Sequence, residues 1–236
     1  MKEKIDFHSH ILPGLDHGCA GLEVSLAQLE MAYQAGTDVM VATSHFYPER
    51  MDIAEFLDHR KECLTLLSEN LPQSCPKIAV GAEVMCRPGL EYMDGLEKLC
   101  VMGTNCMLLE MPHGTWTPAH YETVDAIVDC GFQVVIAHID RYAKDDLDTL
   151  MDLDVVAQIN AESLCSFWDR RRMMHWFKKD RVWALGSDLH GGYDGAYDHF
   201  AKAISKLDAA LTEQVMARSA DLLKDAVYLS KTKIYT

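Results

Sequence analysis

The sequence predicts a single α/β domain over residues 1–236, built as a distorted seven-stranded (β/α) TIM-like barrel with parallel strands. Three observations support this fold class. Seven short apolar runs alternate with longer amphipathic segments, and 49% of the 236 residues are hydrophobic, which is enough for one sizeable core. The runs are also unbroken rather than alternating, as is typical of strands buried on both faces of a parallel sheet. Seven strand–helix units favour a closed barrel over an open sheet.

The seven predicted strands are short segments rich in Val, Ile, Leu and Met. Each is followed by a stretch of helical periodicity or by a turn-forming segment. In chain order they cover residues 4–8, 38–45, 77–84, 106–112, 133–139, 155–160 and 182–188.

Helices are predicted between these strands. Residues 22–33 carry large apolar or aromatic side chains at steps of four, three and four, which places them on one helical face. Gly36 then supplies a residue at which the helix can end. Residues 119–130 repeat this design, with Gly131 as the stop. Further helices are predicted over residues 52–69, 168–179 and 196–230, the last stretch as two helices.

The composition narrows the class of protein. A formal net charge of −14 argues against nucleic acid or an anionic membrane as the main partner. No apolar run approaches the roughly 20 residues of a membrane span, and "MKEKIDF" reaches charged residues too early for a signal peptide. The eight cysteines are scattered without a CxxC pair, which favours reduced thiols in a cytoplasmic protein, several of them in the core.

Imidazole and carboxylate side chains fall at or near the ends of six of the seven predicted strands, and Asn160 ends the remaining one. In a parallel barrel these ends open onto one face, so residues far apart in sequence converge there. Such groups are costly to bury unless they are paired or bind a metal. The predicted cluster consists of His8, His10, His45, Glu83, Glu110, His138, Asp188 and His190.

The spacing of these residues indicates a metal centre. His8 and His10 are two residues apart on a strand, so both imidazoles point to one face, and Asp188 and His190 share that geometry. No cysteine belongs to the pattern, so nitrogen and oxygen ligands suit Mn²⁺, or alternatively Fe²⁺ or Zn²⁺, better than a thiolate zinc site. The ligands exceed what one tetrahedral ion uses, which predicts two or three divalent ions.

The stretch "HSHILPGLDHG" adds two further candidates directly after the first strand. Pro13 and Gly14 are placed to turn the chain, so that Asp16 or His17 can reach a second position in the cluster. Both residues are also candidate proton donors for a leaving group, as is a metal-bound water.

Motifs along the chain resemble those of the bacterial tyrosine phosphatases of the capsular-polysaccharide type, in the polymerase-and-histidinol-phosphatase (PHP) superfamily. The resemblance spans residue 5 to about residue 192 by motif. The motifs are "DFHSHILPGLDHG", "ATSH", "GAEV", "LLEMP", "AHIDRY", "QINAESL" and "GSDLHG". The resemblance implies the PHP form of the seven-stranded barrel and a trinuclear, often manganese-dependent centre. It also implies hydrolysis of phosphotyrosine on the tail of a polysaccharide-export tyrosine kinase.

The resemblance also assigns roles to individual residues. It implies the eight ligands named above, and it places Arg141 where the family has an arginine that holds the substrate phosphate. His17 stands where the family usually has the second of two acids. We interpret His17 as a changed metal ligand, with Asp16 as the alternative ligand or a partner of a ligand. The family often has a second arginine beyond the final histidine, but "GYDGAYDHF" contains none, which weakens the phosphotyrosine assignment more than the metal assignment.

The chemistry expected of this cluster is phosphoester hydrolysis by a metal-activated water, with Arg141 making a bidentate contact to the phosphate. The alternative for Arg141 is an ion pair with a carboxylate such as Asp140. Asn160 binds the substrate or is a satisfied amide at the end of a strand. A cysteine-based phosphatase is unlike this chain, because no cysteine directly follows a predicted strand. The C-x5-R spacing from Cys165 to Arg171 begins five residues after the strand at 155–160 and runs into a predicted helix.

Two aromatic and basic segments have both a functional and a structural interpretation. Tryptophans near the pocket can stack on a tyrosine ring, although they more often pack helices. Adjacent arginines can attract a phosphorylated or acidic peptide, although a solvated helix face is the default. The residues concerned are Trp116, Trp168, Trp176, Arg170, Arg171 and Arg172.

Three other functions compete with a protein-tyrosine phosphatase. One is a related phosphatase of a small phosphate ester such as histidinol phosphate. Another is an amidohydrolase-like barrel, although that class usually has eight strands and often a bridging lysine, where this chain has Glu83 and Glu110. The third is a metal-binding regulator with weakened activity. The oligomeric state is not indicated by the sequence.

Overall fold

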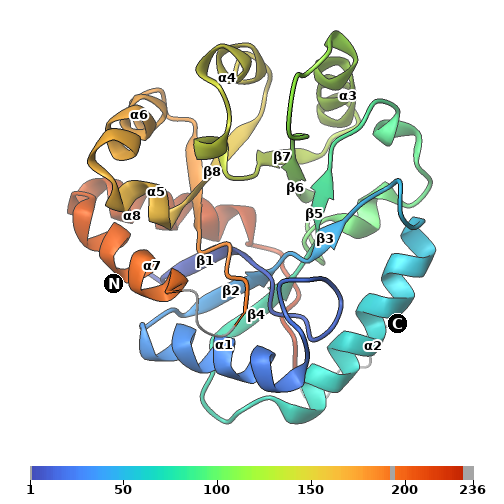
Figure 1. The fold of residues 1–236 in the computed structure, drawn as a ribbon, viewed down its shortest axis with the longest axis vertical. Coiled ribbons are helices and arrows are strands. Elements are labelled where there is room, and N and C mark those ends of the chain that lie inside the picture. Colours follow the sequence, from blue (N-terminus) through green and yellow to red (C-terminus); the bar gives the residue numbers. More distant parts are fainter. Residues whose placement is uncertain (1, 192–194, 231–236) are drawn as a thin grey trace.

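The computed structural model describes residues 2–191 and 195–230, and within them parallel strands occupy the centre and helices the outside (Figure 1). The strands are β1 (Ile5–Ser9), β2 (Val39–Ala42), β3 (His45–Phe46), β4 (Lys77–Val80), β5 (Glu83–Met85), β6 (Cys106–Glu110), β7 (Gln133–Ile136), β8 (Val156–Asn160) and β9 (Val182–Gly186).

The helices follow the strands along the chain. The α-helices are α1 (Leu22–Gln34), α2 (Ile53–Asn70), α3 (Pro118–Asp129), α4 (Lys144–Leu150), α5 (Ala161–Cys165), α6 (Phe167–Lys178), α7 (Ala196–Lys206) and α8 (Ala209–Leu222). Three short 3₁₀ helices complete the structure: η1 (Leu90–Tyr92), η2 (Leu96–Leu99) and η3 (Ile139–Arg141).

The strands of the described residues form two sheets, and every strand pair within them is parallel. The smaller sheet has the order β1-β2-β4 and the larger one β3-β5-β6-β7-β8-β9. The predicted α/β class with parallel strands is confirmed. The number of strands differs, because nine strands in two sheets replace the expected seven strands in one sheet.

The difference arises in the second and third predicted strands, each of which is divided between the two sheets. Residues 38–45 form β2 in the smaller sheet and begin β3 in the larger one, and residues 77–84 are divided between β4 and β5 in the same way. The division places His45 and Glu83 at the starts of two paired strands, directly opposite each other in the β3–β5 register. Two residues predicted at strand ends are therefore neighbours in one sheet.

The two sheets meet where β1 runs beside the end of β9. The backbone N–H of Asp188 donates to the carbonyl of His8 at 2.8 Å, and the N–H of His10 donates to that of Leu189 at 3.2 Å. These contacts bring the chain after β1 against the chain after β9, and with them the two predicted pairs of ligands.

Asp6 in β1 holds this junction together. Its carboxylate accepts hydrogen bonds from the N–H of Ser187 at 2.8 Å, from the Ser187 hydroxyl at 2.6 Å and from the Tyr197 hydroxyl at 2.6 Å. Burial raises the pKa of Asp6, and these hydrogen bonds oppose that shift. Because a fully buried carboxylate is costly unless several donors pair it, Asp6 and its partners fix the junction between the two sheets.

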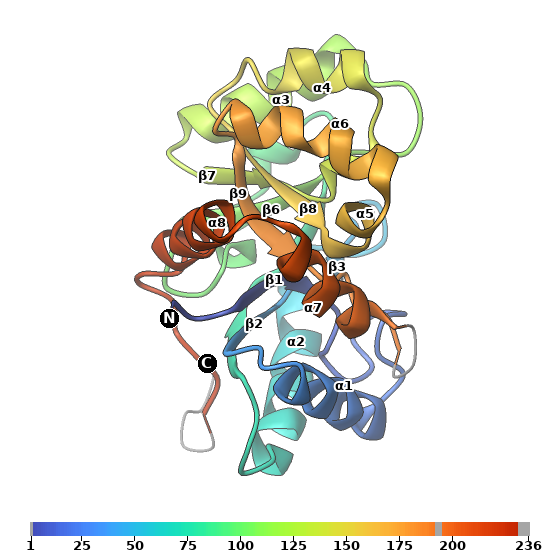
Figure 2. The ribbon, with the colours of Figure 1, turned by 90° about the vertical axis from the view of Figure 1, so that its left-hand side faces the viewer.

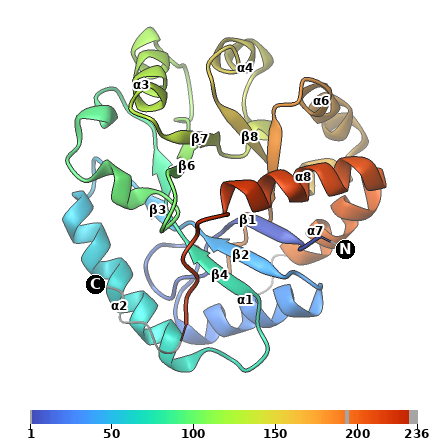
Figure 3. The same ribbon diagram turned by 180° about the vertical axis from the view of Figure 1, so that it is seen from behind.

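The helices cover the two sheets from opposite ends of the molecule. α1 and α2 lie beside the smaller sheet, whereas α3, α4 and α6 lie beside the larger one (Figures 2 and 3). No helix of the described ranges is both long and apolar enough to cross a membrane.

Most predicted helices agree with the structure to within one residue at each end. Gly36 and Gly131 follow α1 and α3 with φ of 73° and 91°, as expected of residues that end helices. The stretch 196–230 forms two helices as predicted, but they end at Leu222. The short helices α4 and α5 are not predicted, because one or two turns carry too few residues for a helical period.

The cysteines and tryptophans mostly serve the core. All eight cysteines lie in the described ranges, and four of them are buried: Cys19, Cys86, Cys100 and Cys106. Trp116 and Trp176 are also buried, which confirms the packing interpretation for both residues. Trp168 differs, because 73% of it is exposed.

Candidate metal centre

The eight predicted ligands come together at the carboxyl ends of the strands and at the start of β3 and β5. Within the described residues, three groups have ligand atoms that all lie within 4.8 Å of one another. The groups are His8 with His10 and Asp188, His45 with Glu83 and Glu110, and His10 with His45 and His190. We call the first of these the β1/β9 group and the second the β3/β5/β6 group.

The β1/β9 group presents two imidazoles and one carboxylate to a common point. The Nε2 atoms of His8 and His10 lie 3.2 Å apart, and Asp188 Oδ1 is 3.5 Å from the first and 3.3 Å from the second. The i, i+2 spacing of the two histidines along the chain produces this convergence, as predicted.

Each imidazole of this group is held from behind by a polar side chain. His8 Nδ1 lies 3.1 Å from Gln158 Oε1, and His10 Nδ1 lies 2.9 Å from Asp16 Oδ2. Both partners are acceptors, so each Nδ1 carries a proton and donates it. The Nε2 atoms are then the nitrogens whose lone pairs can bind a metal, in the arrangement common for metal-bound histidines.

Asp16 has both carboxylate oxygens occupied by the protein. Oδ2 also accepts from the backbone N–H of His45 at 2.9 Å, and Oδ1 accepts from that of Gly18 at 2.9 Å. Burial alone raises the pKa of Asp16, but the hydrogen bonds and the charge of His10 outweigh this and hold it far below its ordinary value. Asp16 thus holds the predicted ligand His10, and its ionised carboxylate is unsuited to donate a proton.

The β3/β5/β6 group contains buried atoms that the protein leaves unsatisfied. His45 Nδ1 lies 2.8 Å from Glu83 Oε2 and 3.9 Å from Glu110 Oε2. All three atoms are buried without a partner in hydrogen-bonding geometry. Buried polar atoms are nearly always paired in proteins, because an unpaired one costs about 1–3 kcal/mol. A divalent cation among them would satisfy all three, so these residues fit a metal.

His138 contacts both glutamates of the β3/β5/β6 group. Its Nε2 is 2.9 Å from Glu83 Oε1 and 3.5 Å from Glu110 Oε1. Burial alone lowers the pKa of His138, but its contacts with the two carboxylates outweigh this and raise the pKa to about 9. His138 is thus protonated at neutral pH in the metal-free protein.

Neighbouring groups of opposite charge also shift the pKa values of His10 and Glu83. Burial lowers the pKa of His10, yet hydrogen bonds to Asp16 and Asp188 raise it well above its ordinary value. Burial raises the pKa of Glu83, but the charge of His8 and hydrogen bonds from other histidines hold it well below its usual range. Without metal, protons on the imidazoles balance the buried carboxylates, and cations binding there must displace them.

Two predicted ligands adopt a left-handed backbone conformation. His138 has φ of 32° and Asp188 has φ of 51°. This region is uncommon for residues other than glycine and costs on the order of 1–3 kcal/mol, so it persists only where surrounding contacts enforce it. Each residue is the second one after a strand, β7 or β9, where the left-handed turn directs the side chain into the cluster.

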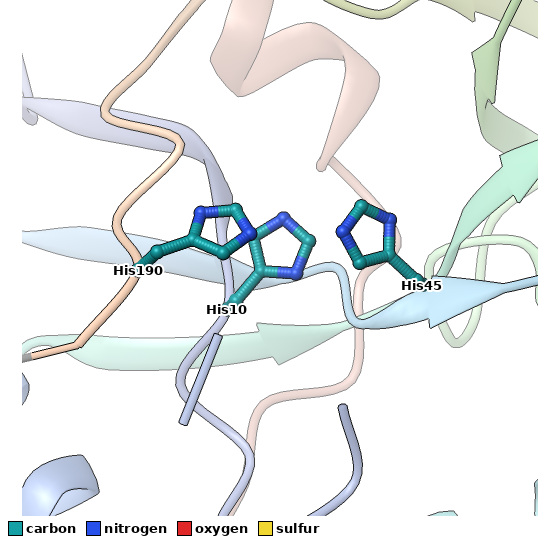
Figure 4. Close-up of side chains that lie close together, drawn as sticks. All are labelled: His10, His45 and His190. Carbon is teal, nitrogen blue, oxygen red and sulfur yellow. The ribbon is translucent and has the colours of Figure 1, made fainter. Parts of the chain in front are cut away.

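His190 and His17 lie on the outer side of the centre. Figure 4 shows the rings of His10, His45 and His190, and the centroid of His10 is 4.1 Å from that of His190 and 4.3 Å from that of His45. The exposed ring of His17 stacks on His45, with centroids 4.8 Å apart and planes at 9°. Among the described residues, no candidate ligand group includes His17. The structure thus places His17 beside the expected ligands rather than among them.

Arg141 and Asn160 both bind Asp188. The Arg141 guanidinium contacts Asp188 Oδ2, and 44% of the arginine side chain is exposed. The Asn160 amide donates to the same oxygen at 2.9 Å. The predicted alternative, an ion pair of Arg141 with Asp140, is replaced by the pair with Asp188. A pocket of about 410 Å³, which Arg141 and Asn160 help to line, opens beside them.

Sequence reasoning missed Gln158 on β8. Its Oε1 accepts from the backbone N–H of His138 at 2.6 Å as well as from His8, and its Nε2 donates to Asn160 Oδ1 at 2.9 Å. One buried amide thus connects two predicted ligands, His8 in β1 and His138 after β7, with Asn160 at the end of β8. Gln158 is two residues before Asn160 and so shares its face of the strand, a signal that went unused because the residue is uncharged.

The stretch in which the family often has its second arginine contains no arginine in this chain. Part of "GYDGAYDHF", residues 192–194, lies outside the described residues. The remainder begins α7, and it contains no arginine.

Comparisons with known proteins agree with this geometry. A family model described as "Capsular polysaccharide synthesis, CpsB/CapC" matches residues 4–220. The tyrosine-protein phosphatase CpsB of Streptococcus pneumoniae is 29% identical over 209 residues, which are 79% of this chain and 82% of that protein. The CpsB of Streptococcus agalactiae serotype V is 25% identical over 206 residues, with the same shares covered.

Solved structures show a similar fold. A chain from the structures of YwqE of Bacillus subtilis and CpsB of Streptococcus pneumoniae, described as metal-dependent tyrosine phosphatases, superposes with a TM-score of 0.76. The match covers 94% of this chain and 95% of that one, at 20% sequence identity. A TatD-like protein of Archaeoglobus fulgidus gives a TM-score of 0.55 at 14% identity over 93% of this chain and 99% of that one.

Proposed function

The chain belongs to the CpsB/CapC family of capsular polysaccharide synthesis proteins, and we propose that it is a metal-dependent protein-tyrosine phosphatase. The observation that carries the proposal is the set of buried, unsatisfied atoms His45 Nδ1, Glu83 Oε2 and Glu110 Oε2 beside the converging His8 and His10. Buried nitrogen and oxygen atoms without hydrogen-bond partners, next to two converging imidazole Nε2 atoms, are the donor set of a cation site. The CpsB relatives supply the reaction.

The two ligand groups that share no residue would each hold one cation. His8, His10 and Asp188 would bind the first, and His45, Glu83 and Glu110 the second, with His138 beside the glutamates. A third cation would use His190 and share His10 or His45 with its neighbours. Ligands of nitrogen and oxygen favour Mn²⁺, with Fe²⁺ or Zn²⁺ as alternatives. When bound, such ions lower the pKa of water to supply a nucleophile and balance charge on the phosphoryl oxygens.

The protein side chains position the substrate and the ligands. Arg141 is exposed at the mouth of the centre, where its planar guanidinium can leave Asp188 for a bidentate contact with the phosphate. Asn160 keeps Asp188 in place, because both ends of its amide are engaged with neighbours. Asp16 keeps His10 in the tautomer that binds metal through Nε2.

The leaving group of a phosphotyrosine needs little help from the protein. A phenol has a pKa near 10, far lower than that of an alcohol, so a phenolate departs more readily. Asp16 is ionised and engaged, which leaves His17 on the exposed rim, or solvent, as the source of the final proton.

The proposed substrate is a phosphotyrosyl protein, the tail of a polysaccharide-export tyrosine kinase in the cytoplasm. The chain would act as one PHP domain over residues 1–236, in which β1–β2–β4 and the larger sheet together make a distorted barrel. Support for this geometry comes from the hydrogen bonds between the end of β1 and the residues after β9.

Steady-state hydrolysis tests the proposal. Purified protein with Mn²⁺ should release phosphate from a phosphotyrosyl peptide with a kcat/KM at least about tenfold above that for histidinol phosphate, and chelation should remove the activity. A preference for histidinol phosphate would support the small-ester alternative instead. Stoichiometric metal binding without turnover of any aryl phosphate would identify a regulator.

A further inference from the structure

A second pocket lies on the surface of α6, outside the metal centre. Its volume is about 360 Å³, and within the described residues no carboxylate lines it. Apolar side chains from Leu147, Trp168 and Trp176 and cationic ones from Lys144, Arg171 and Arg172 contribute to its walls. The proposed chemistry at the metal centre uses none of them. We call this pocket with the adjoining Phe167 the α6 surface.

Two large aromatic residues at the start of α6 are exposed to solvent. Trp168 is 73% exposed and Phe167 is 60% exposed, and their rings meet edge to face with centroids 5.2 Å apart. Single exposed apolar residues are ordinary, but adjacent aromatic side chains next to a concave pocket are typical of a binding surface.

The charge of the α6 surface is opposite to that of the whole chain, whose net charge is −14. Lys144 is paired with Asp148. Arg172 lies 4.0 Å from Asp169 and donates to the backbone carbonyls of Asp140 and Tyr142. Arg171 makes no ion pair with any residue of the described ranges. A cationic pocket without carboxylates, in an acidic protein, is complementary to an acidic ligand.

The α6 surface lies one helix away from the pocket beside Arg141 and Asn160. Asp169, in the first turn of α6, helps to line the pocket that Arg141 and Asn160 border, whereas Trp168 lines the second pocket. Arg172 holds the carbonyl of Asp140, the residue before Arg141. Figures 1 and 2 show α6 beside α5 and the end of β8, on this side of the molecule. One helix therefore separates the two pockets.

We propose that the α6 surface binds the polypeptide segment that flanks the phosphotyrosine, and that this segment is acidic and carries an apolar or aromatic side chain. The inference rests on the proposed function, because the phosphotyrosine occupies the metal centre. A helix is about 10 Å across and an extended residue spans about 3.3 Å, so the bound side chain lies about three to five residues from the phosphotyrosine. The aromatic floor takes this side chain, and Arg171 attracts the acidic residues beside it.

An anionic membrane is the other partner that exposed aromatics and cations can attract. The peptide is favoured for two reasons. Trp168 borders a concave pocket of about 360 Å³, which fits a single side chain better than a lipid surface, and one helix separates this pocket from the one beside Arg141.

The test compares a large and a small substrate in the same variants. With Mn²⁺, kcat/KM is measured for phenyl phosphate and for a phosphotyrosyl peptide of about twelve residues with acidic and aromatic flanks. Trp168→Ala and Arg171→Glu should each lower the peptide-to-phenyl-phosphate ratio of kcat/KM about tenfold, through the KM for the peptide. Added salt should reduce the ratio in the unmodified protein and have less effect in Arg171→Glu.

Matched controls are available at the opposite end of the molecule. Tyr33→Ala removes a 45% exposed aromatic residue from α1, and Lys61→Glu reverses an exposed charge on α2. Both should keep the unmodified ratio. The proposal is overturned if the α6 variants keep that ratio, or if they lower kcat/KM for both substrates equally.

Two binding measurements distinguish peptide binding at the α6 surface from the proposed phosphatase function and from membrane binding. Fluorescence anisotropy of the same peptide without phosphate should show weaker binding to Trp168→Ala than to the unmodified protein, even if no aryl phosphate is hydrolysed. That result would support peptide binding at the α6 surface even if the protein proved not to be a phosphatase. Sedimentation with phosphatidylcholine–phosphatidylglycerol vesicles that depends on Trp168, with an unchanged substrate ratio, would assign the surface to a membrane and refute the peptide.

Discussion

The β1/β9 group and the β3/β5/β6 group contain similar ligands in different surroundings. In the first, side chains of Asp16, Gln158 and Asn160 hold the ligands from behind. In the second, His45 Nδ1 and one oxygen of each glutamate are buried without a hydrogen-bond partner. The first group is therefore ordered by the protein itself, whereas the second depends on what binds there.

The difference has a structural origin. The β1/β9 group lies where two strand ends exchange backbone hydrogen bonds, so nearby loops and β8 can supply partners. The β3/β5/β6 group lies where the chain has just passed from the smaller sheet to the larger one. The shape of the first group therefore does not require a cation. In the second group, a cation would bind the buried atoms that lack a hydrogen-bond partner.

The largest effect is expected from removing a ligand of the ordered group. His8→Ala or Asp188→Ala should lower Mn²⁺-dependent hydrolysis of phenyl phosphate more than about 100-fold, because the loss of a ligand exceeds the 10–100-fold typical of its supporting partners. Circular dichroism should show a folded protein. Near-normal activity in either variant would mean that this group does not hold the reacting ion.

A smaller effect is expected from removing the support of that group. Gln158→Leu deletes the acceptor for His8 Nδ1 and for the His138 N–H, and should weaken Mn²⁺ binding about 10–100-fold in a chelator-competition titration. Gln158→Glu keeps the acceptor and loses the donor to Asn160, so its loss should be smaller. Equal losses in the two variants would show that packing, not the hydrogen bond to His8, matters.

His138, beside the β3/β5/β6 group, should make both the stability of the metal-free protein and its Mn²⁺ affinity depend on pH. Its pKa of about 9 exceeds the ordinary 6.5. In the metal-free protein its ion pairs stabilise the fold fully below about pH 6.5, and this stabilisation is lost as the pH rises through about 9. Metal must displace this proton, so Mn²⁺ affinity should rise between these values. Calorimetry in buffers of different ionisation enthalpy should detect proton release, and its absence at pH 7.5 would contradict this assignment.

The smallest effect is expected from Glu110→Gln, which removes one buried charge from the unsatisfied group. The free energy of unfolding of the metal-free protein should rise by about 1 kcal/mol, because the new amide nitrogen can donate to Glu83 Oε2 while the amide oxygen still accepts from His138 Nε2. The additional stabilisation by Mn²⁺ should fall in the same variant. If metal-free Glu110→Gln is instead less stable, the unsatisfied oxygens are not a source of strain.

The sequence was sufficient to predict which imidazole and carboxylate side chains come together, and insufficient to predict which other residues hold them. His8, Glu110 and Asp188 were identifiable because parallel strands end at one face, whatever their order. Gln158 was not, since an uncharged amide within an apolar run is as easily a sheet residue as a partner of two histidines. The positions of Asp16 and His17 depend on a turn in which Gly18 packs against His10, where a Cβ would lie only 2.2 Å from the histidine Cβ.

One feature of the fold was also not predictable from the sequence. An apolar run of eight residues looks alike whether the strand remains in one sheet or passes to another, so the division of residues 38–45 and 77–84 was not foreseen. That division nevertheless decides which ligands become neighbours, because it sets His45 opposite Glu83. Pairing between distant strands is a property of the whole fold and leaves no local pattern.

The central claim is that these side chains form two cation sites that share no residue. Anomalous diffraction from a crystal grown with Mn²⁺ tests it most directly. The account predicts one peak among His8, His10 and Asp188 and another among His45, Glu83 and Glu110, with His17 contacting neither. An empty β3/β5/β6 group at saturating Mn²⁺, with its buried atoms still unpaired, would contradict the account.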